Sequence, residues 1–187
     1  MTRIILIYGG IGALIVGSLM IWGMLSWTPE QMAGTDAGGM DNGLVVGYLT
    51  QIIALTTVFL GIKHFRDRER GGVIKFLPAF LVGLGISAVA SLGWIIGWEI
   101  VLVSGFDYQA LMNGMAEQQA AASGLTGAAL EQKLAEGQAF MKLYMENPFV
   151  RVPITFIEMF PVGVLISLIS ALLLRNSRFM PARQAVA

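Results

Sequence analysis

The chain has 187 residues, of which 56% are hydrophobic and 13% are charged, and its mean hydropathy is +0.71. Soluble domains carry about 25% charged residues, so this composition excludes an ordinary soluble fold and indicates a protein of the lipid bilayer. The formal net charge is zero and there are no cysteines, which excludes disulfides, thiolate metal sites and a cysteine nucleophile and gives no sign of nucleic-acid binding.

Four apolar runs predict an all-α fold, a four-helix transmembrane bundle that forms a single membrane domain over residues 1–187. The runs cover about residues 4–25, 44–62, 76–103 and 152–174. A helix needs roughly 20 such residues to cross about 30 Å of hydrocarbon. The first run is longer than the apolar region of about 7–15 residues in a cleavable signal peptide, so we expect it to be retained.

Small residues recur every four positions in two of the predicted spans. Such ridges let helix backbones approach closely, which is how helices associate where lipid removes the hydrophobic drive. The third span is therefore our candidate for the centre of the bundle. The ridges contain Gly9, Ala13 and Gly17 in the first span, and Ala79, Gly83, Ser87, Ser91, Gly93 and Gly97 in the third.

A charge cluster separates the second span from the third, and Gly71-Gly72 marks its turn. We interpret it as a cytoplasmic hairpin that fixes orientation and faces the lipid headgroups; contact with anionic lipid or a partner is the alternative. The only histidine, His64, is expected at a helix end and not as a catalytic base. The basic residues of the hairpin are Lys63, Arg66, Arg68, Arg70 and Lys75.

The distribution of basic residues predicts the orientation. If the amino terminus is inside, nine of the twelve basic residues are inside, as the positive-inside rule requires. Both termini are then cytoplasmic, and the protein is integral to a cell membrane. The nine are Arg3, the five hairpin residues, Arg175, Arg178 and Arg183; the remaining three are Lys133, Lys142 and Arg151.

Residues 104–151 predict an extracytoplasmic helical hairpin between the third and fourth spans. Its helices are expected at about 107–122 and 126–146, with Thr126 as a cap and Asn147-Pro148 as the stop. We expect the hairpin to fold over the bundle mouth or lie on the bilayer; a partner-binding arm is the alternative. The apolar stripe of the second helix contains Leu130, Leu134, Met141 and Met145.

Three spans carry a strongly polar residue near the predicted outer surface. Glu99 lies roughly 6 Å before the outer end of the third span, Glu158 roughly 9 Å into the fourth, and Gln51 roughly 10 Å into the second. These depths predict one shared layer in the outer leaflet. Ionisable residues in spans usually face the bundle interior and have partners.

Two interpretations of this layer stay open. Two neighbouring carboxylates would share a proton or hold a cation, with Gln51 and Thr155 as polar neighbours and Tyr48 one turn above Gln51. Alternatively, Arg151 neutralises one carboxylate, Glu99 sits at the headgroup boundary, and Glu158 pairs structurally with Gln51 or Arg151. No bound metal ion or cofactor is predicted.

Three blocks of the chain carry a resemblance: FLGIKHFRDRERGGVIKFLPAF, then GWEI, then FIEMFPVGVLISLISALLLR. Together they resemble the small bacterial membrane proteins of the domain of unknown function family 4199, over about residues 46–175. Leu77-Pro78 departs from the pattern, which usually has a Gly-Lys or similar pair there. The resemblance implies a four-helix integral protein of a bacterial inner membrane with no established activity, and its pattern includes both Glu99 and Glu158.

The sequence favours a non-enzymatic membrane or envelope component that assembles with itself or a membrane partner through its small-residue helix faces. It has no HExxH, P-loop, GxSxG or Cys/His motif, so we expect no enzyme. The alternative is a small proton- or cation-linked carrier or channel that uses Glu99 and Glu158. The lipid bilayer is the expected surrounding, and nucleic acid is not an expected partner.

Overall fold

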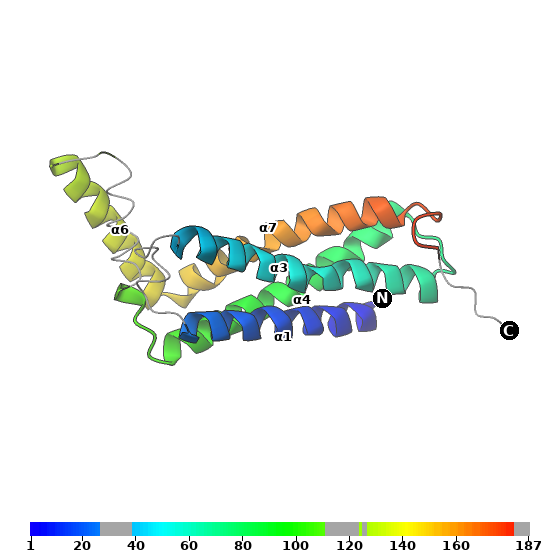
Figure 1. Ribbon diagram of the computed structural model, residues 1–187, viewed down its shortest axis with the longest axis horizontal. Coiled ribbons are helices and arrows are strands. Elements are labelled where there is room, and N and C mark those ends of the chain that lie inside the picture. Colours follow the sequence, from blue (N-terminus) through cyan, green and yellow to red (C-terminus); the bar gives the residue numbers. More distant parts are fainter. Residues whose placement is uncertain (27–38, 111–123, 125–126, 182–187) are drawn as a thin grey trace.

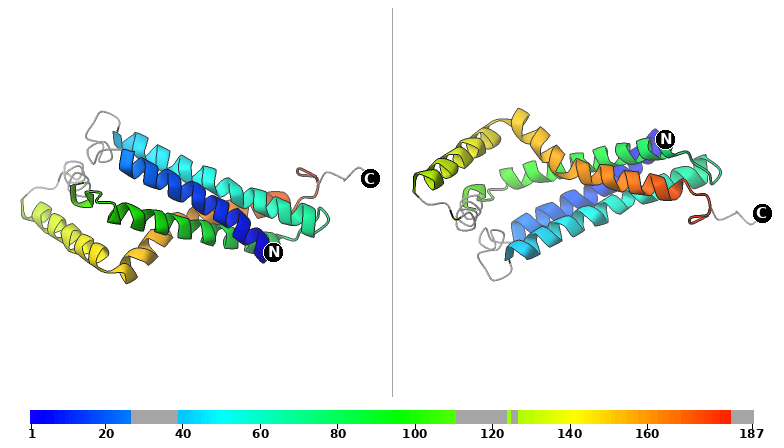
Figure 2. Two further views of the ribbon diagram at one scale, coloured as in Figure 1. Left: turned by 90° about the horizontal axis from the view of Figure 1, so that it is seen from below. Right: turned by 90° about the horizontal axis from the view of Figure 1, so that it is seen from above.

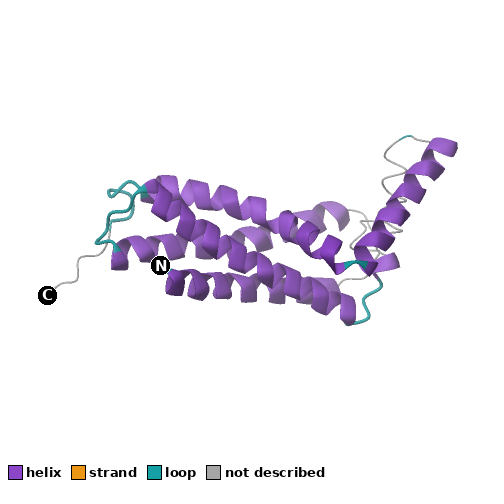
Figure 3. Cartoon of the chain, turned by 180° about the vertical axis from the view of Figure 1, so that it is seen from behind, coloured by secondary structure: helices purple, strands orange, loops and turns teal. Residues whose placement is uncertain are grey.

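The computed structural model describes residues 1–26, 39–110, 124 and 127–181, and every regular element in these ranges is a helix (Figures 1 and 3). The all-α prediction is confirmed for this part of the chain. Four helices, α1, α3, α4 and α7, are long and apolar enough to cross a membrane. The elements are α1 Thr2–Ser26, α3 Gly39–His64, the π-helical turn η1 Phe65–Glu69, α4 Phe76–Val103, α6 Ala128–Glu146 and α7 Pro148–Leu174.

The start of α1 and the end of α7 lie at one end of the bundle, which we call the inner end, and α6 lies at the other, the outer end (Figure 1). Two contacts hold the inner end together. The amino group of Met1 pairs with Glu69 at 2.9 Å. Arg66 donates from Nη1 to the carbonyl of Phe179 and from Nη2 to that of Met180. The four spanning helices therefore alternate in direction.

A seam of small residues joins α1 to α4, which run parallel. A Cβ built on Gly93 would overlap the backbone of Ala13, and one on Gly17 would lie 3.0 Å from the Gly93 carbonyl oxygen. The backbones touch because neither side has a large side chain, as expected for helix association in lipid. The facing pairs along this seam are Gly9 with Val89, Ala13 with Gly93, and Gly17 with Gly97.

A second small face of α4 packs against α7, which runs antiparallel to it. Ser87 Oγ lies 3.1 Å from Ser167 Oγ, and the Ser167 hydroxyl donates to the Gly163 carbonyl at 2.7 Å. A Cβ on Gly83 would lie 2.8 Å from Ser167. The third span is thus central, as predicted. However, its ridges are occupied within the chain, so they are not the free assembly faces that the sequence indicated.

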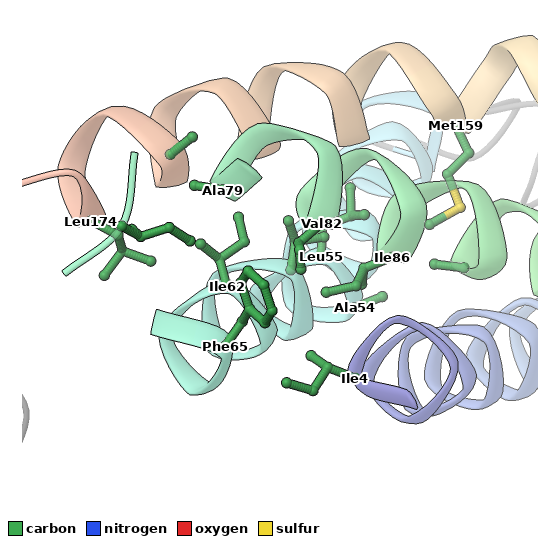
Figure 4. Packing of buried hydrophobic residues seen from close by; sticks show 14 of the residues in the cluster. Ile4, Ala54, Leu55, Ile62, Phe65, Ala79, Val82, Ile86, Met159 and Leu174 are labelled. Carbon is green, nitrogen blue, oxygen red and sulfur yellow. The ribbon is translucent and has the colours of Figure 1, made fainter. Parts of the chain in front are cut away.

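The apolar core runs along the bundle from Leu174 at the inner end of α7 to Met159 in its outer half (Figure 4). Leu55 and Ile62 of α3 meet Ile86 of α4 there, and Met159 and Leu174 of α7 join the same cluster. All five side chains are fully buried. Large apolar residues on the outside of the bundle remain exposed, which suits a surface in contact with lipid.

Arg66 corrects the prediction that the whole basic hairpin faces the lipid headgroups. Its side chain is 0% exposed and also donates to Asp67 at 2.7 Å, while Lys63 is half-buried and pairs with the same carboxylate. Of the five basic residues of the hairpin, only Arg68, Arg70 and Lys75 are exposed. Arg66 turns inward because the π-helical turn redirects the side chains after α3.

The predicted turn at Gly71-Gly72 is confirmed, since both residues have positive φ values of 62° and 87°. Such backbone is strained for residues with a Cβ and accessible to glycine. It allows the chain to reverse directly between η1 and α4.

Span boundaries differ from prediction most clearly at α7. The dipeptide Asn147-Pro148 was predicted only to stop the preceding helix, but it also starts α7. Asn147 Oδ1 accepts from the Phe149 amide at 3.0 Å, and Pro148 occupies the first turn, where a missing N–H costs nothing. Helix α7 therefore begins four residues before the predicted boundary, and α3 begins five residues before its own.

The second helix of the outer hairpin is confirmed as α6, with Leu130, Leu134, Met141 and Met145 partly buried along one stripe. Helix α6 does not fold over the bundle but projects past its outer end at an angle to α7 (Figure 2). Most of the predicted first helix, and the proposed cap Thr126, lie outside the described residues.

Candidate functional site: an outer polar cluster

An arginine–carboxylate pair joins α7 to α4 at the outer end. Arg151 Nε donates to Glu99 Oε1 at 2.7 Å, and its Nη2 donates to Oε2 at 2.8 Å. This bidentate arrangement is the strongest geometry available to the two groups. Of the two options open from sequence, the structure selects neutralisation of Glu99 by Arg151.

The same guanidinium also holds α6. Arg151 Nη1 donates to the carbonyl of Met145 at 2.7 Å and to that of Tyr144 at 3.4 Å. These carbonyls belong to the last turn of α6, where helix carbonyls lack intrahelical partners. One buried side chain therefore fixes three helices at a single point, and we call this arrangement the Arg151 clamp.

Aromatic residues line the inner side of the Arg151 clamp. Tyr144 Oη lies 2.9 Å from the buried hydroxyl of Thr155. The Tyr144 ring stacks on that of Tyr108 with centroids 6.3 Å apart, and the Tyr108 ring meets the Trp98 indole edge-on at 5.4 Å. Thr155 thus serves the α6–α7 contact, not a Glu158 site as the sequence indicated.

Glu158 has a different partner from Glu99. The indole Nε1 of Trp94 donates to Glu158 Oε2 at 3.4 Å, and no cationic group bonds this carboxylate among the described residues. The Glu158 side chain is exposed on the outside of the bundle. A charge at the middle of a spanning helix costs about 3 kcal/mol by insertion scales, so an uncompensated carboxylate here needs an explanation.

The two glutamates do not share the predicted layer. Arg151 meets Glu99, whereas Glu158, seven residues further along α7, meets Trp94, five residues back along α4. At 1.5 Å per residue this register separates them by about 8–10 Å along the bundle. The prediction counted the position of Glu158 from residue 152, whereas α7 begins at Pro148 and Glu158 lies ten residues into it.

Gln51 and Tyr48 lie apart from the Arg151 clamp. Gln51 is 7% exposed, and its Oε1 has no hydrogen-bond partner in the structure, so the predicted bond to Glu158 is not formed through this atom. Tyr48 is exposed on the surface of α3. The six predicted site residues therefore do not form one site. Glu99 and Arg151 form the Arg151 clamp and Thr155 lies beside it, whereas Glu158, Gln51 and Tyr48 lie apart from it.

Several members of the cluster were not predicted from sequence. Trp94 bonds Glu158, and Trp98 is buried with an Nε1 that has no hydrogen-bond partner among the described residues. Tyr144 lies between Met141 and Met145 at the end of the α6 stripe, and its position before Asn147-Pro148 was the available signal that it would touch the bundle.

The hydrogen bonds of this cluster attach helices to one another. Its one cation is fully used by Glu99 and two carbonyls, and its hydroxyls bond each other. Among the described residues there is no group of three His, Cys, Asp or Glu side chains able to hold a metal ion. Nothing in these contacts places a base beside a nucleophile, which acyl or glycosyl transfer would require.

Tyr108 is expected to ionise only in strongly alkaline solution. Burial, followed by the proximity of Tyr144 and the Glu158 carboxylate, raises the pKa of Tyr108 to about 12. Because the folded protein keeps this proton longer than the unfolded chain, the stability it contributes is complete below pH ~10 and is lost as pH rises towards ~12. Ultraviolet titration of ionised tyrosine in detergent measures this directly.

The substitution Tyr108→Phe assigns that titration. It is expected to remove the step at the highest pH and leave those of the other tyrosines in place. Burial also raises the pKa of Tyr144, so Tyr144→Phe is the matched control and removes a different step. If Tyr108→Phe instead removes a tyrosine titration step near pH ~10, the usual value for a solvated tyrosine, the burial of Tyr108 would be contradicted.

The comparisons with known proteins agree with this architecture. No curated protein and no solved structure matches the chain. The family described as "Protein of unknown function (DUF4199)" matches residues 6–176, which include most of α1, all of the other three spanning helices, the Arg151 clamp and Glu158. The chain therefore belongs to the DUF4199 family.

Proposed function

We propose that this protein is a non-enzymatic, multi-pass component of the bacterial inner membrane that acts by holding α6 at the outer surface and by assembling with another membrane protein. The observation that carries this proposal is the Arg151 clamp. Its polar groups bond one another and hold α4, α6 and α7 together, which suits a protein that presents α6 as a rigid arm. Chemistry on a substrate would need uncommitted groups at the same place.

The proposed orientation places both termini in the cytoplasm and α6 outside. It is supported by exposed Arg68, Arg70, Lys75 and Arg178 at the inner end, where they would meet anionic headgroups. Each basic residue near such a surface is worth about 1 kcal/mol. The nearby acids Asp67 and Glu69 are already paired, so they do not cancel this charge.

A proton- or cation-linked carrier is the competing function, and one observation favours it: Glu158 has no cationic partner among the described residues. Two observations oppose a carrier: Glu99 is paired with Arg151, and it lies at a different level of the bundle from Glu158. The two-carboxylate exchange site is therefore not supported. A carrier would therefore depend on Glu158 alone.

Flux measurements separate the two functions. The purified full-length protein is reconstituted in vesicles carrying a pH-sensitive dye, and gradients of protons, sodium and potassium are imposed. We expect leakage equal to that of empty vesicles for both the wild type and Glu158→Gln. Flux above that level in the wild type, lost in Glu158→Gln but retained in Glu131→Gln, would overturn the proposed function in favour of the carrier.

A further inference from the structure

The exposed face of α7 carries a regular stripe with Glu158 near its outer end. Residues spaced alternately three and four apart fall on one side of a helix, the spacing by which a second helix packs along it. All members of this stripe are exposed on the outside of the bundle. They are Glu158, Pro161, Leu165, Leu168 and Leu172.

The depth of Glu158 places its carboxylate in hydrocarbon and not among headgroups. Helix α7 has 27 residues, so it is about 40 Å long against about 30 Å of hydrocarbon. Glu158 lies ten residues after Pro148, or about 15 Å from that end. If the excess length is shared between the ends, the carboxylate is about 10 Å below the outer boundary.

Among the residues that the structure describes, none brings a cation to that position. Arg151 is bound to Glu99 and to α6, and Arg66 is buried at the inner end. Lys133 and Lys142 are exposed on α6, which projects past the outer end of the bundle. Residues 27–38, 111–123 and 125–126, whose placement is not described, contain no lysine or arginine in their sequence, and residues 182–187 contain one, Arg183.

We infer that the Glu158 stripe binds a transmembrane helix of another protein, one that carries a lysine or arginine at the level of Glu158. This inference rests on the proposed function and specifies the partner's chemistry. A buried charge in lipid is normally matched by an opposite charge on a neighbouring helix. The leucines supply the packing surface, and the charge pair fixes which helix binds and in which register, as single polar positions do in helix pairs.

The surroundings of Glu158 favour a cation over other occupants. Trp94 donates to one carboxylate oxygen, which orients the group and leaves the other oxygen free. Pro161 has no N–H, so the carbonyl of Ile157, the residue before Glu158, lacks its usual helical donor. Lysine has three donors and arginine five, so either can serve a carboxylate and a carbonyl together.

A second copy of this chain does not fit the stripe. Its spanning helices would have to bring a free cation to the level of Glu158, and the two buried arginines of the described residues, Arg66 and Arg151, are already engaged. Two facing stripes would instead bring two Glu158 carboxylates together, which repel each other. The face is therefore specific for a different, positively charged helix.

Synthetic transmembrane helices test this inference with a defined probe. Leucine-rich helices with lysine, glutamine or leucine one third of the way across are mixed with the labelled full-length protein in phosphatidylcholine vesicles, and energy transfer is measured. We expect the lysine helix to bind wild type about tenfold more tightly than the leucine helix does, a difference typical of a favourable charge pair. Glu158→Gln should abolish that preference.

Controls make each outcome decisive. Glu131→Gln, which removes an exposed carboxylate on α6, should keep the preference. Equal binding of all three helices to wild type, or a preference that survives Glu158→Gln, overturns the inference, as does energy transfer between two copies of the protein that depends on Glu158. The flux assay is independent, so absence of flux with equal helix binding rejects the partner while leaving the proposed function intact.

Discussion

Replacing Arg151 with glutamine is expected to lower the free energy of unfolding by about 3 kcal/mol and to release α6 from the bundle. The substitution leaves the Glu99 carboxylate without its cation and the carbonyls of Tyr144 and Met145 without their donor. This expected loss of stability is at the low end of the range for a broken buried ion pair, because the Glu99 side chain is 36% exposed and keeps some solvation.

Two measurements check this prediction. Denaturant unfolding in detergent gives the change in stability, and hydrogen exchange follows the amides of residues 128–146, which should exchange faster once α6 is free. Lys142→Gln, which removes an exposed cation from α6, is the matched control and is expected to change stability by less than ~0.5 kcal/mol. Unchanged exchange in α6 would show that Arg151 does not hold the arm.

A double-mutant cycle isolates the pair itself. Glu99→Gln should cost less than Arg151→Gln, because Arg151 keeps its two carbonyls when the carboxylate is lost. Combining both substitutions should cost less than their sum, since the second removes a group already unpaired. Additive costs would mean that the 2.7 Å contact contributes little to folding.

The two ends of the bundle use the same device. Arg66 at the inner end and Arg151 at the outer end each bond one carboxylate and two backbone carbonyls of a neighbouring segment. Arginine suits this task because its planar, permanently charged group has five donors in fixed directions. The consequence is that both the C-terminal segment and α6 are tied to the helices by charged bonds, while the middle of the bundle is held by packing.

The sequence predicted the spans well because hydrophobicity and length are local properties. The third span was placed at residues 76–103, as observed, and its central position followed from small residues spaced every four. The four-residue spacing did not show whether the helix face that packs against these ridges belonged to the same chain or to another one. Because Gly93 faces Ala13 and Gly83 faces Ser167, the ridges that suggested assembly between molecules are used within one.

The candidate site was harder to predict because it depends on register between distant segments. Asn147-Pro148 both ends α6 and begins α7, whereas a stop signal alone placed Glu158 six residues into its helix and the structure places it ten residues in. The choice of Glu99 as the partner of Arg151 follows from that corrected register. Burial of Arg66 could not be foreseen either, since an arginine in a charged turn is usually exposed, and its acceptors lie more than a hundred residues away.

The second large effect is expected at the seam between α1 and α4, where Gly93→Ala should destabilise the bundle by about 3 kcal/mol. The added methyl group would overlap the backbone and side chain of Ala13, and neither can move without separating the helices. Since lipid offers no hydrophobic drive to restore the contact, loss of close packing is not recovered elsewhere. Unfolding in detergent micelles gives the change in stability.

Gly10→Ala is the matched control, because a Cβ at Gly10 meets nothing within 4 Å and the residue lies on the same pair of helices. Alanine favours helix over glycine by up to about 1 kcal/mol in water, so this variant should be neutral or slightly more stable. The absence of cysteine allows spin labels to be placed on cysteines introduced at exposed Leu14 and Ile96. Gly93→Ala should broaden and lengthen the distance between them, whereas Gly10→Ala should not. An unchanged distance and stability in Gly93→Ala would mean that the two backbones do not touch at this point, and the placement of α4 as the central helix would lose its main support.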